Sequence, residues 1–165
     1  MIPVPPEIVA VLEGRPDIGT LDQAFILLTV DDEGVADVCL LSRSEMEADP
    51  GEVRLVVAGR KARANLGRSG QATLVAVAGG VPNYLALRTR ATVEADGALA
   101  VALSVTRVLR DDLGIELHPI MFRVEERLAV TERWERSTAL LGELRRLGGG
   151  SAGPAPRTGS PRGRD

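Results

Sequence analysis

Short segments with a two-residue apolar period recur along most of the chain, and they limit its possible folds more than any other feature. The clearest segment is residues 84–95, where polar side chains occupy several of the even positions, including Arg88, Arg90 and Glu94. We expect the odd-numbered side chains of this strand to share the opposite face: Leu85, Leu87, Thr89, Ala91 and Val93.

Six further segments resemble strands, which gives seven in all: residues 24–30, 35–41, 52–58, 71–78, 84–95, 98–109 and 120–124. Residues 98–109 are rich in Ala and Leu, which favours a helix, but their alternating pattern favours a strand, and we give the period priority. Helical patterns cover residues 5–13, residues 60–68 and residues 131–147. These elements predict a mainly β, α+β fold, namely an antiparallel barrel with peripheral helices and a C-terminal helix.

The domain organisation follows from length and composition. A chain of 165 residues with 44% hydrophobic residues is expected to form one domain, here residues 1–147. Residues 148–165 are rich in Gly, Pro and Arg, and they hold too few apolar side chains to order themselves. No Gly-x-Gly-x-x-Gly follows a predicted strand, which disfavours a doubly wound nucleotide-binding sheet.

Charge and cysteine content exclude several classes of protein. Twenty basic and 23 acidic residues give a net charge of −3, so we expect no nucleic-acid partner. Cys39 is the single cysteine, it lies in an apolar run, and no long apolar segment or secretion signal is visible. The sequence therefore predicts a cytoplasmic protein without a membrane segment. One histidine and one cysteine also make a Cys/His metal cluster impossible, so we expect no metal.

The most informative stretch is Gly59 to Leu66, where Arg60, Lys61 and Arg63 stand at a predicted change from strand to helix. Free backbone N–H groups and the helix dipole at such a position favour an anion such as a phosphate. The residues alone leave a second interpretation equally open, in which this is a solvated basic helix start.

The order of strands from Ala24 to Val77, together with the Lys61…Asn65-Leu66 block, resembles the pyridoxamine 5′-phosphate oxidase-like, FMN-binding split β-barrel family over residues 5–126. The resemblance implies a six- or seven-stranded split barrel that forms a homodimer with flavin at the dimer interface. Many relatives read Ser-Lys-Thr-Ala-Arg-Asn-Leu, so this chain lacks two hydroxyl donors, at positions 60 and 62.

The same resemblance assigns roles to individual residues. Lys61 would contact the FMN phosphate, Ser42 would lie along the cofactor edge, and Asn65 would brace the helix start. Arg60 and Arg63 would replace the missing hydroxyls, since guanidinium groups bind phosphate in a bidentate manner.

Arg88 has two interpretations. It would lie at the mouth of the cofactor pocket, or it would share with Arg90 an exposed face balanced by Glu94.

The function implied is that of an FMN-binding, flavin-dependent oxidoreductase that acts on a small molecule. A deazaflavin in place of FMN would also fit the family. The alternative is a barrel without cofactor that serves as a non-catalytic, dimeric binding or interaction module.

Overall fold

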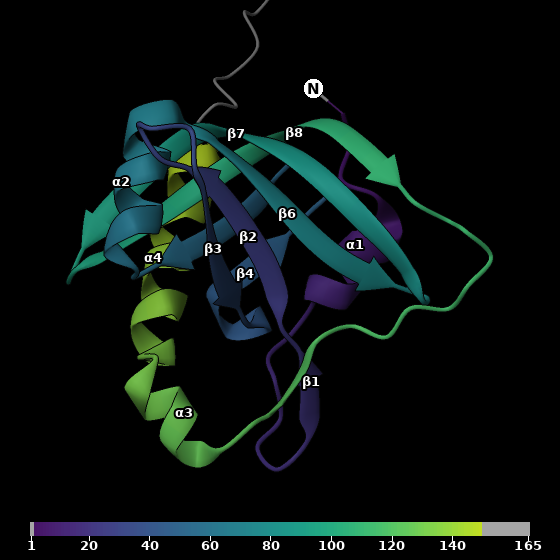
Figure 1. Cartoon of the computed structure of the whole chain (residues 1–165). Helices are drawn as coiled ribbons and strands as arrows, with labels where there is room; N and C mark the ends of the chain where they lie inside the picture. Colours follow the sequence, from purple (N-terminus) through teal and green to yellow (C-terminus); the bar gives the residue numbers. More distant parts are fainter. Residues whose placement is uncertain (1, 150–165) are drawn as a thin grey trace, which may run out of the picture.

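The computed structural model describes residues 2–149, and its centre is one curled antiparallel sheet (Figure 1). The seven strands follow the order β3-β2-β6-β7-β8-β5-β4. Their bounds are β2 Phe25–Val30, β3 Ala36–Leu41, β4 Met46–Ala48, β5 Val53–Val57, β6 Gln71–Ala78, β7 Val81–Ala95 and β8 Ala98–Arg110. The mainly β, seven-stranded prediction is confirmed.

Two predictions about the strands are wrong in detail. The seventh strand of the sheet is β4, which lies in a segment expected to be a loop. The last predicted strand is present as β9 (Met121–Arg123), but it pairs with the unpredicted β1 (Leu21–Gln23) in a separate two-stranded sheet. Figure 1 shows the reason, since residues 111–120 leave β8 and run away from the large sheet before they reach β1.

Tight turns join the longest strands. Asp96 and Gly97 connect β7 to β8, and both have positive φ, 52° and 73°. Gly79 and Gly80 connect β6 to β7 in the same way, with φ of 57° and 75°. Two consecutive residues with positive φ match the right-handed twist of a β-hairpin, and Asp-Gly and Gly-Gly are the pairs that tolerate them best.

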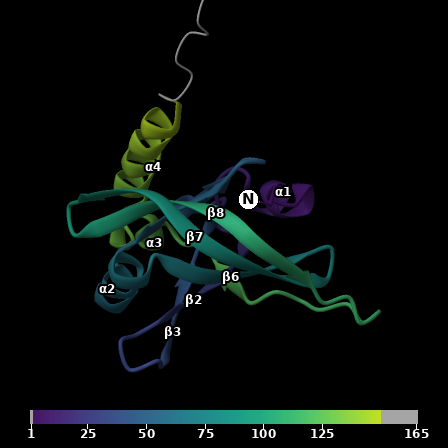
Figure 2. The same ribbon diagram turned by 90° about the horizontal axis from the view of Figure 1, so that it is seen from above.

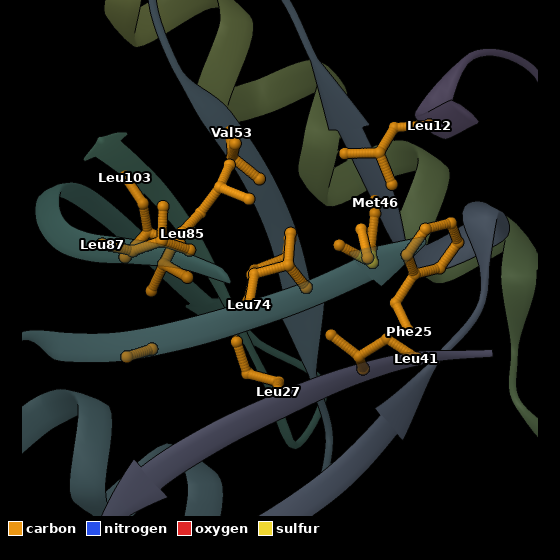
Figure 3. Close-up of a cluster of buried hydrophobic side chains, with 14 of the residues drawn as sticks. Leu12, Phe25, Leu27, Leu41, Met46, Val53, Leu74, Leu85, Leu87 and Leu103 are labelled. Carbon is orange, nitrogen blue, oxygen red and sulfur yellow. The ribbon is translucent and has the colours of Figure 1, made fainter. Parts of the chain in front are cut away.

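The main hydrophobic core fills the inside of the curled sheet (Figure 3). Phe25, Leu27, Leu74 and Leu85 are each 0% exposed. Helix α1 (Pro6–Leu12) closes the core with Ile8 and Leu12, which lie one helical turn apart. Each such fully buried side chain contributes roughly 1.5–3 kcal/mol of hydrophobic free energy.

A second core lies on the outer side of the sheet, under helix α4 (Trp134–Gly149), which Figure 2 shows on one side of the strands. Alanines 98, 100 and 102 of β8 are at most 3% exposed and let the helix approach closely. Leu140, Leu141 and Leu144 of α4 pack against them. Strand β8 is therefore buried on both faces from residue 98 to residue 105.

The remaining helices are short. Helix α2 (Arg60–Ser69) follows β5 and ends at Gly70, close to the prediction for residues 60–68. A 3-10 turn, η1 (Arg43–Glu45), and helix α3 (Glu126–Thr131) were not predicted. Helix α4 continues to Gly149, two residues past its predicted end, and the rest of the predicted tail lies outside the described residues. Within residues 2–149, no helix combines the length and apolar character needed to cross a membrane.

Candidate functional site

The N-terminal end of α2 presents uncompensated positive charge. Gly59 precedes the helix and supplies no side-chain cap, and the first turn contains no acidic residue. Arg60 and Lys61 are both exposed, and neither forms an ion pair within the described part of the chain. The uncapped N–H groups, the helix dipole and the two cations all favour an anion at this end of α2.

Ala62 and Arg63, the next two residues of α2, contact other parts of the protein. Ala62 is 3% exposed in the main core, so the position where relatives carry a threonine hydroxyl holds a buried methyl group. The Arg63 guanidinium lies 3.3 Å from the Glu94 carboxylate at the end of β7. Glu94 therefore pairs with Arg63 and not with Arg88 or Arg90, which corrects the alternative interpretation of that strand.

Asn65 is buried, and its side chain forms a hydrogen bond inside the protein. Its side-chain amide donates a 3.0 Å hydrogen bond to the Thr29 hydroxyl of β2. The two side chains are 5% and 2% exposed. Asn65 thus braces α2 against the sheet from the middle of the helix.

Ser42 lies at the end of β3, where it caps η1. Its backbone N–H donates to Glu45 Oε2 at 2.9 Å, its hydroxyl bonds the same oxygen at 3.1 Å, and it also contacts the Ser44 hydroxyl. Burial raises the pKa of Glu45, and the hydrogen bonds from Ser42 oppose that rise. Ser42 also lines a cavity of about 240 Å³ with Ala24, Leu40, Leu41, Glu45, Phe122, Leu128, Glu132 and Trp134.

Arg88 lies elsewhere, on the outer face of β7. It lines a cleft of about 900 Å³ where the sheet meets the C-terminal end of α2. None of the other predicted site residues lines this cleft.

The six predicted site residues therefore lie in three places. Arg60, Lys61, Arg63 and Asn65 share α2, whereas Ser42 and Arg88 line two separate hollows. Sequence reasoning missed Arg68 and Arg107 in the cleft and Glu45 in the cavity. Of these three residues, only Glu45 could have been found from the sequence, because Ser42 with a glutamate three residues later is the pattern of a capping box.

Comparisons with known proteins identify solved structures that are similar to this chain. No family model matches the chain, and no curated protein matches it in sequence. Among solved structures, the flavin reductase of styrene monooxygenase from Pseudomonas putida S12 is similar, with a TM-score of 0.50 and 10% identity over 70% of this chain and 91% of that chain. HupZ from Group A Streptococcus is similar with a TM-score of 0.51 and 12% identity over 70% of this chain and 99% of that chain.

The chain has the split β-barrel fold. At 10–12% identity the two similarities establish the architecture of the chain and not its chemistry. The resemblance to the split-barrel family is thus confirmed at the level of the fold.

Proposed function

We propose that this split-barrel protein binds FMN and acts as a flavin-dependent oxidoreductase on a small molecule. The observation that carries the proposal is the N-terminal end of α2, where Arg60 and Lys61 are exposed beside uncapped backbone N–H groups. The flavin reductase from Pseudomonas putida S12, which has the same fold, supports the choice of a flavin over other phosphate-bearing ligands.

The residues present fit the phosphate end of the cofactor. Arg60 and Lys61 would hold the phosphate, and Arg63 would add to the local positive charge although Glu94 partly balances it. Position 62 supplies no hydroxyl, because its residue is an alanine, and the Ala62 methyl group is buried in the core. Ser42 would lie near the cofactor through its position at the end of β3. The bound flavin would supply the redox chemistry, while the protein orients it and sets its electrostatic surroundings.

We further propose that the protein is a homodimer. The outer faces of β3 and β2 place apolar side chains opposite one another, and Val75 of β6 extends this surface beside Ile26. We call it the outer apolar face: Ile26, Leu28, Val30, Val38, Leu40 and Val75. Val30, Val38 and Leu40 are 47%, 55% and 56% exposed, and an exposed apolar sheet face of this kind is typical of a protein interface.

Flavin titration tests the proposed function. The purified protein is expected to be yellow or to quench the fluorescence of added FMN, and its absorbance spectrum distinguishes FMN from a deazaflavin. The double variant Arg60→Ala/Lys61→Ala should bind FMN at least about tenfold more weakly, because each cation–phosphate hydrogen bond contributes roughly 1.5–3 kcal/mol.

Two controls sharpen the result. Riboflavin lacks the phosphate, so the double variant should bind it as the unchanged protein does. Arg146→Ala removes an exposed arginine of α4 and should leave FMN affinity unchanged. A colourless protein that ignores FMN, riboflavin and deazaflavin would contradict the proposal and favour a non-catalytic binding module.

A further inference from the structure

The 900 Å³ cleft around Arg88 is an open hollow on the outer face of the sheet. It lies where β2, β6, β7 and β8 meet the C-terminal end of α2, at the opposite end of that helix from Arg60 and Lys61. Its size falls within the range of small-molecule sites, which is roughly 300–1,000 Å³.

Three arginines line the cleft, and no aspartate or glutamate does. Arg88 and Arg107 form neither a side-chain hydrogen bond nor an ion pair in residues 2–149, and Arg68 donates only to the carbonyl oxygen of Val30. Several arginines elsewhere in the described residues are paired with carboxylates, for example Arg54, which contacts three. Arg90 and Arg146 also form no ion pair in residues 2–149, but neither lines this cleft, where three arginines without an ion pair lie together.

A β-bulge places Arg107 in the cleft. Ala86 pairs with Arg107 and Leu87 pairs with Val105, so Thr106 is an extra residue in β8. The bulge lets Thr106 and Arg107 both line the outer cleft, although they are consecutive. Without it, strand alternation would turn one of the two toward the core, where Val105 and Val108 lie.

The bulge brings like charges onto one face of neighbouring strands. Arg107 is paired with Ala86, two residues before Arg88, and both arginines are exposed on that face. Arg88 and Arg107 are diagonal neighbours, which lie within reach of long side chains, so an anion between them would relieve their mutual repulsion.

Apart from Gln71, the rest of the lining is apolar or carries hydroxyl groups. Leu28 and Ala86 contribute half-buried apolar surface, while Thr73 and Thr106 carry hydroxyls. The Thr106 hydroxyl donates to the Ala86 carbonyl at 3.1 Å, which fixes its position beside the two arginines. The lining thus combines an apolar surface with three guanidinium groups, each able to bind a phosphate or carboxylate in a bidentate manner.

We propose that this cleft binds a small anionic molecule in which a phosphate or carboxylate group is attached to an apolar body. The arginines take the anionic group, and Ala86 contacts the apolar part together with Leu28, which also belongs to the outer apolar face, so the cleft adjoins the proposed dimer contact. The site does not depend on the proposed flavin site, and its ligand binds whether or not a flavin is present.

Calorimetric titration of the full chain at low salt tests the proposal, with phenyl phosphate, inorganic phosphate and phenol as probes. Phenyl phosphate should bind several-fold more tightly than inorganic phosphate, since it also buries its ring, and phenol should not bind measurably. The double variant Arg88→Ala/Arg107→Ala should weaken phenyl phosphate at least about tenfold, and FMN affinity should stay the same.

The matched control is Arg146→Ala, which removes one exposed arginine of α4 without touching the cleft. Circular dichroism and thermal unfolding confirm that each variant is folded, and light scattering reports its oligomeric state. The proposal is overturned if the unchanged protein binds none of the probes, or if the double variant binds phenyl phosphate as tightly as Arg146→Ala does. A double variant that alters only the oligomeric state would show that the arginines serve a contact with a second copy.

Discussion

At the residue scale, the hydrogen bond between Asn65 and Thr29 ties α2 to the sheet inside the core. Asn65→Leu leaves the Thr29 hydroxyl without a partner, and Thr29→Val leaves the Asn65 amide without one. Each change should cost about 1–3 kcal/mol of unfolding free energy, because a buried polar group then lacks a hydrogen bond. The double variant should lose less unfolding free energy than the two single variants lose together. Urea denaturation of the unchanged protein, the two single variants and the double variant measures this difference. Strict additivity would mean that the two side chains do not stabilise one another.

The thiol of Cys39 is expected to be less reactive than that of a free cysteine. Burial raises the pKa of Cys39 to about 11, and the nearby Glu45 and Asp37 carboxylates add to the effect. Since the thiolate is the reactive form, Cys39 should react with a thiol reagent much more slowly at pH 7 than a free cysteine does. Its rate should rise with pH and level off only near pH 11. A plateau below pH 9 would contradict the assignment.

At the scale of elements, two glycines of α2 are expected to respond oppositely to the same substitution. Gly70 ends the helix with φ of +63°, so Gly70→Ala should lower the unfolding free energy by about 1–2 kcal/mol. Gly67 lies inside the helix, exposed and with no neighbouring atom within 4 Å of an added Cβ. Gly67→Ala should raise the unfolding free energy by up to about 1 kcal/mol. Thermal and urea unfolding of the two variants compare them directly, and equal signs would contradict the assigned end of the helix.

Strand β7 shows how far local pattern can predict an element and where it fails. The two-residue period located the strand, but it also predicted that Leu85, Leu87, Ala91 and Val93 share one face. The pairing skips Arg90, so the two halves of the strand face different cores. Leu85 and Leu87 lie in the main core, whereas Ala91 and Val93 pack on the second core under α4. A bulge depends on the partner strand, which no pattern within residues 84–95 contains.

At the scale of the whole molecule, the sequence was most informative where an element carries its own periodicity. The strands from β2 to β8, apart from the three-residue β4, and helices α1, α2 and α4 were all located in this way. Strands β1, β4 and β9 have three residues each, and distant partners decide how they pair. The same distinction applies to the candidate sites, because one can be located from neighbouring residues in the sequence and the other depends on the fold. The cations at the start of α2 lie within four residues and are visible in the sequence. The cleft, in contrast, joins Arg88 and Arg107 through the register of β7 and β8, and Arg68 reaches it from the end of α2.

The outer apolar face gives the last prediction, which concerns assembly. The unchanged protein should be a dimer by light scattering and sedimentation at micromolar concentration. Val38→Glu places a charge on β3 where the side chain is 55% exposed, so the fold should be retained while the dimer is weakened. Leu147→Glu is the matched control, since this leucine is 59% exposed on α4, away from β3. It should leave the dimer intact. A monomeric unchanged protein, or a Val38→Glu variant that dimerises equally well, would show that the outer apolar face serves another purpose.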